Sequence, residues 1–248
     1  MNLEKKREYV KTSLFIAAIL LIKFVVIDMY KIPSGSMIPT LNIHDRVLVN
    51  QLAYSLRIPG TEYHIAKISE PKRGDVVVFY EHNSGDIYIK RVMAIGGDKV
   101  SQIGEQIYIN DKPLKTKKVS YPNLTSQFDY FNEQNGGKSY IIQYNKNVSN
   151  WFNYINIYRH GDFGTKKEQR KIRYSNWVVP YGKLFMMGDN RDNSKDSRFL
   201  KGSFISIDQV IGKAIAVPFN LSPLNLQSRN GIEFIPRLTK ANTGLYTV

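Results

Sequence analysis

Asp75-Val-Val-Val-Phe-Tyr80, which follows Arg73-Gly74, and, after a short polar break, Ile87-Tyr-Ile-Lys-Arg-Val-Met-Ala-Ile95 form the stretch that decides the fold. Both runs are rich in β-branched and aromatic residues, and the second alternates before the turn signal Gly96-Gly97-Asp98, as expected for strands. Similar short runs recur at 46–50, 106–110, 177–179, 183–187 and 209–218. Short strands with frequent turns favour a mostly β fold, an irregular sandwich or barrel, over alternating strands and helices.

The segment from about residue 111 to 176 differs from the rest of the chain in composition. It is rich in Asn, Tyr, Phe, Lys and Gly, and its periodicity is weak. A loop of this length without secondary structure is uncommon in a compact domain. We therefore expect a smaller β-rich insertion here, closed by the strands on either side.

The composition limits the classes of function. The 248 residues carry a net charge of +14, which suits nucleic acid or an anionic membrane as a partner. A lysine-rich composition throughout explains the charge equally well, and because no basic block or helix-turn-helix pattern occurs, we expect no nucleic-acid partner. The chain has no cysteine, and its four histidines lack the His-Glu-x-x-His spacing of a zinc site. We expect no metal and no cofactor.

The N-terminus has the order of features found in export signals. Lys5, Lys6 and Arg7 precede an apolar run from Leu14 to Ile22, and no pair of small residues follows at the spacing of a cleavage site. We interpret residues 13–30 as a retained transmembrane anchor helix. Basic residues stay on the cytoplasmic side, so 1–12 would lie in the cytoplasm and 31–248 would form an extracytoplasmic catalytic domain. A helix lying flat in the membrane interface is the alternative.

Ile32-Pro-Ser-Gly-Ser-Met-Ile-Pro-Thr-Leu41 contains a turn suited to presenting a nucleophile. Gly35 permits a sharp bend, which exposes one serine hydroxyl and directs a backbone N–H at the same space. A nucleophile beside such a donor is what acyl transfer requires. Taken alone, a Ser-Gly-Ser sequence is more often a plain surface turn.

Lys90 sits between Ile89 and Arg91 on the alternating strand. Adjacent side chains of a strand point to opposite faces, so if Arg91 points to solvent, Lys90 points into apolar surroundings. Burial lowers the pKa of a lysine, and the neutral amine can then act as a general base. A lysine that reaches solvent at a sheet edge is the alternative.

Gly188-Asp-Asn-Arg-Asp-Asn-Ser-Lys-Asp-Ser-Arg198 is dense in small polar and acidic residues. A calcium loop is one interpretation, but the glycine and the late glutamate of such loops do not follow. A cluster of surface turns is another. An ion pair between Asp196 and Arg198 would hold the segment rigid.

Together these three segments resemble the type I signal peptidases of bacteria, whose sequence boxes occur in the same order. The resemblance covers the anchor and most of residues 30–110 and 175–218, and it is weak across the insertion. It implies that Ser36 is the nucleophile and Lys90 the general base, that the Ser34 hydroxyl completes an oxyanion hole, and that Ser194 orients the lysine amine. The positions that it implies for the substrate pockets and substrate-binding strands are Ile32, Pro33, Met37, Leu41, Tyr88 and Ile89. The structural positions that it implies near the site are Asp189, Asp196 and Arg198.

The resemblance implies a single-pass serine endopeptidase of the bacterial plasma membrane, which cuts signal peptides from exported preproteins after a small residue. Its partners would be those signal peptides and membrane phospholipid, with no obligate protein partner. One alternative is a self-cleaving regulator of the LexA type, but neither a DNA-binding domain nor a scissile peptide before the serine is evident. A non-catalytic, membrane-tethered binding module is the other. For Lys195, inside the third segment, the resemblance supplies no role.

Overall fold

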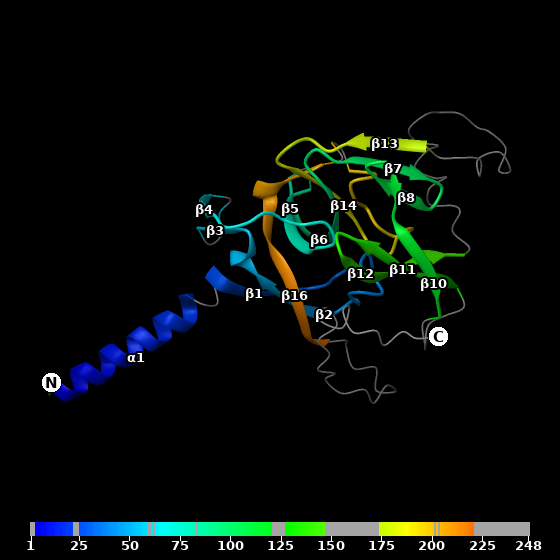
Figure 1. Ribbon diagram of the computed structural model, residues 1–248. Coiled ribbons are helices and arrows are strands. Elements are labelled where there is room, and N and C mark those ends of the chain that lie inside the picture. Colours follow the sequence, from blue (N-terminus) through cyan, green and yellow to red (C-terminus); the bar gives the residue numbers. More distant parts are fainter. Residues whose placement is uncertain are drawn as a thin grey trace, which may run out of the picture.

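The computed structural model describes residues 3–21, 25–58, 61, 63–82, 84–120, 127–146, 174–200, 202 and 204–220. A helix, α1 (Leu3–Leu21), projects from a body that is built of strands (Figure 1). Two short 3-10 turns, Gln51–Ala53 and Ile207–Gln209, connect strands within the body. The prediction of a mostly β protein is confirmed.

The largest sheet has seven strands, and every neighbouring pair is antiparallel. In spatial order they are β1 (Ile27–Lys31), β2 (Asp45–Asn50), β16 (Val210–Asn220), β5 (Val76–Glu81), β6 (Asp86–Ile95), β14 (Lys183–Met187) and β15 (Ile205–Ser206). The stretch that decides the fold therefore becomes the β5–β6 hairpin near the middle of this sheet. Strand β6 is an interior strand, with β5 on one side and β14 on the other.

The valine run of β5 is buried on both faces of the sheet. Val76 and Val78 pack in one core cluster, whereas Val77 and Phe79 pack in another. Successive side chains of a strand point to opposite faces, so a strand that is covered on both sides needs a continuous apolar run. This explains why residues 76–79 of β5 form an unbroken apolar run.

The described residues also form three smaller sheets. The four-stranded one runs in the order β13 (Tyr174–Val178), β7 (Lys99–Ile103), β8 (Gln106–Ile109) and β9 (Lys112–Pro113). The three-stranded one consists of β10 (Lys115–Val119), β11 (Phe128–Asn135) and β12 (Lys138–Asn145), and a hairpin pairs β3 (Ser55–Arg57) with β4 (His64–Lys67). The β10–β12 sheet belongs to the expected insertion, which is strand-rich where the structure describes it. Residues 121–126 and 147–173 of that insertion lie outside the described residues.

The N-terminal anchor is where the structure departs from the prediction. Helix α1 ends at Leu21, and β1 pairs with β2 along its whole length, from Ile27 opposite Asn50 to Lys31 opposite Arg46. The helical assignment of residues 27–30 is therefore wrong, because their backbone groups bond to β2 instead of continuing a helix. Among the described residues, no helix is both long enough and apolar enough to span a bilayer.

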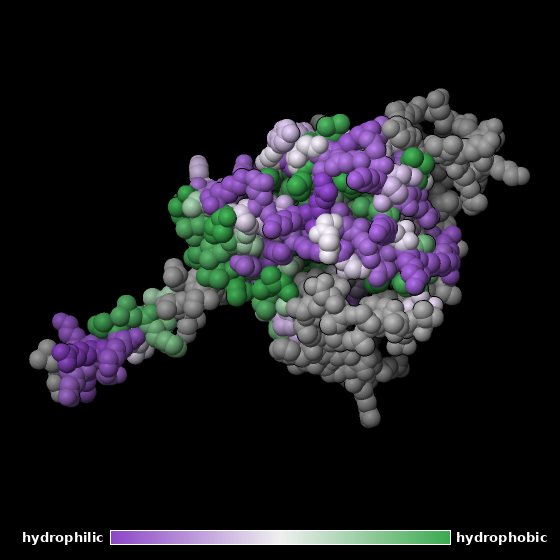
Figure 2. Space-filling view, viewed as in Figure 1, coloured by the Kyte–Doolittle hydropathy of each residue, from purple (hydrophilic) through white to green (hydrophobic). Residues whose placement is uncertain are grey.

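Apolar surface gathers where α1 approaches the body. Figure 2 shows hydrophobic residues on α1 and on the side of the body nearest to it. On α1, the side chains of Leu14, Phe15 and Ile16 are exposed, as are Tyr63 and Ile65 at strand β4 of the body. Scattered exposed apolar residues are ordinary in soluble proteins, but a gathered patch marks an interaction surface.

Candidate active site

The loop 32–41 between β1 and β2 is fastened by its apolar residues. Ile32, Met37 and Leu41 are buried in the same cluster as residues of β2, β5 and β16. The backbone N–H of Leu41 donates to the Met37 carbonyl oxygen at 2.9 Å, which closes one helical turn. These buried residues fix the position of Ser36, which lies between them in the chain. Ser36 itself is buried, at 7% exposure.

Lys90 and Ser36 come together although they lie far apart in the sequence. Lys90 Nζ lies 2.6 Å from Ser36 Oγ and 3.2 Å from the carbonyl oxygen of Ile89. Strand β6 is interior and Lys90 is 3% exposed, so the alternative of a lysine at a sheet edge is wrong. The Tyr88 ring, whose centroid is 5.5 Å from Nζ, adds to the apolar surroundings.

Burial controls the charge of this lysine. Loss of hydration lowers the pKa of Lys90 to about 8, against a smaller opposing effect of the Asp196 and Asp189 carboxylates. A substantial fraction of the amine is thus neutral near pH 8, and a neutral amine 2.6 Å from a hydroxyl can accept its proton. The arrangement can generate a serine nucleophile without a histidine.

Arg91 does not point to solvent, so the condition under which Lys90 was expected to be buried is not met, although Lys90 is buried. Arg91 is 5% exposed, and its guanidinium donates from Nε to Asp189 Oδ1 at 2.8 Å and from Nη2 to Asp189 Oδ2 at 2.6 Å. The same group lies 3.7 Å from the centroid of the Tyr140 ring on β12. The insertion covers this face of β6, and the bidentate pair with Asp189 replaces the water that the arginine loses.

The segment 188–198 lies beside the dyad. The ion pair predicted between Asp196 and Arg198 is present at 2.8 Å, with both side chains buried. Burial tends to raise the pKa of Asp196, but the Arg198 charge and the hydrogen bonds to the carboxylate outweigh this effect, and the pKa is lowered. Asp196 also accepts a hydrogen bond from the backbone N–H of Gly188 at 3.0 Å, which ties the two ends of the segment together.

Gly188 allows three parts of the site to approach closely. A Cβ atom at this position would lie 2.3 Å from Ser194 Oγ and 2.4 Å from the Ser36 carbonyl oxygen, so no larger residue fits. Ser194 is buried here, next to the dyad. The two hydrogen bonds of Lys90 Nζ go to Ser36 and Ile89, however, and not to the Ser194 hydroxyl.

A hollow of about 230 Å³ opens above the dyad. Its lining consists of Ser34, Gly35, Ser36, Tyr88, Lys90, Asn193 and Lys195. Ser34 Oγ lies 3.5 Å from Ser36 Oγ, on the exposed side of the turn. Asn193 and Lys195 are exposed whereas Ser194 and Asp196 are buried, so alternate residues of this segment face the hollow and the interior.

The predicted substrate-pocket residues fall into two groups. Tyr88 lines the hollow, and Ile89 is half-buried against the core cluster that holds the loop 32–41. Ile32, Met37 and Leu41 are buried in that cluster beneath the turn and do not line the hollow, and Pro33 is exposed beside it. Packing in the core thus accounts for three apolar positions that the resemblance assigned to substrate.

Two residues that hold the site together were missed in the sequence. Asn190 donates from its backbone N–H to the Ser36 carbonyl oxygen at 3.1 Å and from Nδ2 to the Gly35 carbonyl oxygen at 2.9 Å. The Thr40 hydroxyl donates to the Asp189 carboxylate. Both residues lie inside the quoted motifs, so position within a motif was the available signal.

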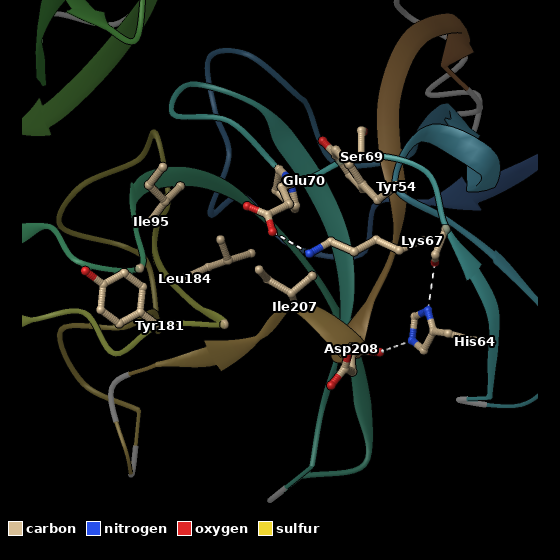
Figure 3. Close-up of a pocket in the computed structure, with 14 residues that line it drawn as sticks. Tyr54, His64, Lys67, Ser69, Glu70, Ile95, Tyr181, Leu184, Ile207 and Asp208 are labelled. Atoms are coloured by element: carbon tan, nitrogen blue, oxygen red, sulfur yellow. Dashed lines mark hydrogen bonds and ion pairs between the residues drawn. The ribbon is translucent and has the colours of Figure 1, made fainter.

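A second cavity, of about 400 Å³, is larger than the hollow and shares no lining residue with it. Figure 3 shows its polar groups engaged with one another: Lys67 pairs with Glu70, and the His64 imidazole lies 2.9 Å from the Asp208 carbonyl oxygen. The other imidazole nitrogen is 2.8 Å from the Ser55 hydroxyl. No group of His, Asp and Glu side chains suited to a metal ion occurs in the described part of the chain. The chemistry of the residues, and not cavity size, identifies the candidate active site.

Comparison with known proteins gives a consistent result. The family model for signal peptidases, peptidase S26, matches residues 6–219. Signal peptidase I of Pseudomonas aeruginosa is 34% identical over 213 residues, which cover 80% of this chain and 67% of that protein. Signal peptidase I of Buchnera aphidicola subsp. Baizongia pistaciae is 31% identical and covers 93% of this chain and 83% of that protein. The enzyme of the same name from Rickettsia canadensis is 30% identical, with coverage of 88% and 82%.

Among solved structures, a signal peptidase I from Enterococcus faecalis V583 is 21% identical in sequence to this chain. The match covers 59% of this chain and 98% of that one, with a TM-score of 0.31. Similarity at this level supports no conclusion about the fold, so the family assignment depends on the sequence matches.

Proposed function

The chain belongs to the signal peptidase family, peptidase S26, and is therefore a serine endopeptidase; we propose that it removes signal peptides from exported preproteins with a Ser36–Lys90 dyad. The observation that carries this proposal is the 2.6 Å separation of Ser36 Oγ from a buried lysine amine whose pKa is lowered to about 8. General-base catalysis requires such reach and a pKa close to the working pH.

The reaction proceeds in two stages. In the first, neutral Lys90 takes the hydroxyl proton of Ser36 while Oγ bonds to the scissile carbonyl carbon. The C–N bond then breaks, and the lysine ammonium returns the proton to the leaving amine, which is the new N-terminus of the mature protein. The signal peptide is left as an ester on Ser36.

In the second stage, a water molecule gives a proton to Lys90 and its oxygen to the ester carbon. Ser36 Oγ leaves with that proton, and the signal peptide departs with a free carboxylate. In both stages, the backbone N–H of Ser36 and the Ser34 hydroxyl, 3.5 Å from Ser36 Oγ, would stabilise the oxyanion.

The hollow sets the substrate rule. The Tyr88 ring lines it with its centroid 5.5 Å from Lys90 Nζ, and we propose that this ring leaves space only for small side chains next to the scissile bond. A peptide could bind as an added strand, in which main-chain hydrogen bonds give affinity and alternate side chains enter the hollow. Cleavage after an Ala-x-Ala sequence follows from this proposal.

The proposed location is the bacterial plasma membrane, with the N-terminus in the cytoplasm and the catalytic domain outside. Its supports are the basic residues before Leu14 and the exposed apolar side chains of α1. The apolar surface on the side of the body nearest to α1 would contact phospholipid (Figure 2). Protease added outside spheroplasts should then digest the body and spare only a short N-terminal fragment.

The test of function uses the full-length protein in detergent. A preprotein with an Ala-x-Ala cleavage site should be cut once, after the second alanine, and the products identified by mass. Ser36→Ala, purified in the same way, should leave the preprotein intact. Equal cleavage by Ser36→Ala, or a cut elsewhere in the preprotein, would contradict the proposal.

A further inference from the structure

Strand β12 of the insertion contacts a neighbour of each member of the dyad. Tyr140 on β12 stacks on Arg91, the neighbour of Lys90 on β6. Gln143, also on β12, forms a parallel bridge with Asn190, the residue whose backbone N–H and side chain hold the carbonyl oxygens of Ser36 and Gly35. The insertion is therefore linked to each member of the dyad through one intervening residue. Arg91 links it to Lys90, and Asn190 links it to Ser36.

An ion pair fastens this contact. Arg191 donates from Nη1 to Glu133 Oε2 on β11 at 2.9 Å and from Nη2 to Glu133 Oε1, and each residue is only 1% exposed. The Tyr140 hydroxyl donates to Glu133 Oε1 at 2.8 Å, so the carboxylate is engaged from both sides. Arg191 has the largest of the fully buried side chains among the described residues.

Backbone hydrogen bonds continue the connection to the nucleophile. The backbone N–H of Arg191 donates to the Gln143 carbonyl oxygen at 3.0 Å, and the Gln143 N–H donates to the Asp189 carbonyl oxygen, also at 3.0 Å. Residues 189–191 are thus held by β12 along one side. On the other side, Asn190 holds the turn that carries Ser36.

We infer that Glu133 is a positioning residue: by fixing Arg191 against the insertion, it sets the place of Asn190 and, through Asn190, of the Ser36 hydroxyl relative to Lys90. This inference depends on the proposed function, since it assigns to the insertion a part in the same reaction. It also explains why a buried charge pair is present here. Removing two charges from water costs free energy that offsets their attraction, so such a pair by itself is a poor source of stability. Small displacements of a nucleophile can cost up to about a hundredfold in rate.

The test separates position from stability. Under single-turnover conditions with enzyme in saturating excess, the cleavage rate constant belongs to the bound complex and does not depend on how much of the enzyme is folded. Glu133→Gln should lower this rate constant at least tenfold for a peptide with an Ala-x-Ala site. Peptide binding should change less than about threefold, because Glu133 does not line the hollow. The pH at half-maximal rate should stay that of the wild type, since Glu133 is not among the groups that shift the pKa of Lys90.

Lys138→Met is the matched control. Lys138 is also on β12, and it pairs with the buried Asp75, which keeps a second lysine, Lys213, at 2.8 Å. This variant removes an ion pair of the insertion that does not lead to Asn190, so its single-turnover rate constant should equal that of the wild type. Tyr140→Phe keeps the ring over Arg91 and removes one hydrogen bond to Glu133, so we expect a smaller fall of about twofold to fivefold.

The outcomes of these experiments separate the inference from the proposed function. If Glu133→Gln keeps the wild-type rate constant, or if Lys138→Met falls equally, the inference is wrong while the proposed function stands. If the wild type itself fails to cut the peptide, the proposed function fails instead. Should Glu133→Gln not fold, the double variant Glu133→Met with Arg191→Met removes both charges and restores packing. A wild-type rate constant in that double variant would overturn the inference, and a tenfold lower one would support it.

Discussion

The two faces of strand β6 place a buried basic side chain in opposite environments. On the face that it shares with Val77 and Val92, Lys90 is 3% exposed and forms no ion pair with any described residue. On the face toward the insertion, Arg91 is 5% exposed and is bound by both oxygens of Asp189. Burial is similar on the two faces, but the two groups differ in their partners and in their ordinary pKa, and both differences favour a permanent charge on Arg91 and a titratable one on Lys90.

The pKa values follow the partners. Burial opposes the charge of both side chains, and for Lys90 it prevails, so the pKa is lowered to about 8. For Arg91, the Asp189 carboxylate outweighs the effect of burial, and the pKa is raised. A reactive amine and a permanent structural cation can therefore occupy adjacent positions on one strand, because each face supplies a different environment.

The largest effect is expected from variants that remove the Ser36–Lys90 dyad. Ser36→Ala and Lys90→Ala should each lower kcat for preprotein cleavage by at least about 10³-fold, because each removes a group that no neighbour replaces. Lys90→Arg should be equally inactive at every accessible pH, since a guanidinium keeps its proton. The measurement is cleavage of a purified preprotein in detergent, with circular dichroism to show that the variants are folded. An active arginine variant would mean that Lys90 is not the base.

Removing the ion pair between Arg91 and Asp189 should mainly lower the stability of the fold. Asp189→Asn leaves the Arg91 cation buried without its counter-charge, which should lower the free energy of unfolding by about 3–5 kcal/mol. Asp111→Asn is the control: it removes an exposed partner of Lys99 and should cost less than about 1 kcal/mol. Urea titration of the two variants compares them directly. Equal stability of Asp189→Asn and the wild type would show that Arg91 does not depend on this pair.

The pH dependence sharpens the comparison. Only the neutral form of Lys90 can accept the Ser36 proton, so kcat/KM should rise with pH, about tenfold per unit on the acid side, and reach a plateau above its pKa of about 8. Arg91 stays charged throughout and should add no second limb. A profile that is flat from pH 5 to 9 would contradict the assignment of the base.

The smallest effect is expected at the mouth of the hollow. Lys195 is exposed there and forms no ion pair with any described residue. Lys195→Ala should therefore change the cleavage of a peptide without charged residues near the scissile bond by less than about threefold. Steady-state kinetics at 0.15 M salt is the measurement. A loss comparable to that of Lys90→Ala would place Lys195 in the reaction itself.

Ser36 and Lys90 could be singled out because three motifs occur together and resemble those of a known family; a Ser-Gly-Ser turn or a lysine on a strand, taken alone, has a commoner interpretation. The burial of Arg91 could not be predicted, because its partner Asp189 lies 98 residues further along the chain and its cover comes from the insertion. The inferred role of Glu133 could not be predicted for the same reason, because it depends on a contact with Arg191, 58 residues away in the sequence.

The strands of the main sheet were predicted more successfully than its first edge. Apolar runs such as those of β5 and β14 are buried regardless of which strands pair with them, so they can be recognised from the sequence alone. Their observed bounds differ from the predicted ones by at most one residue. Residues 27–30 are equally consistent with the end of a helix or with a strand. Only their pairing with β2, which begins at Asp45, distinguishes the two.

The unpaired burial of Lys90 has a consequence for the folding equilibrium. In the unfolded chain its pKa is near 10.5, against about 8 in the folded protein, so below pH 8 the fold must hold a dehydrated ammonium. The resulting penalty is about 3 kcal/mol. Between these two pH values the unfolded chain binds more protons than the folded one, so this residue makes the protein more stable as pH rises from 8 to 10.5, and contributes no penalty above that range. Lys90→Met should consequently melt at a higher temperature than the wild type at pH 7, and the gap between them should close in alkali.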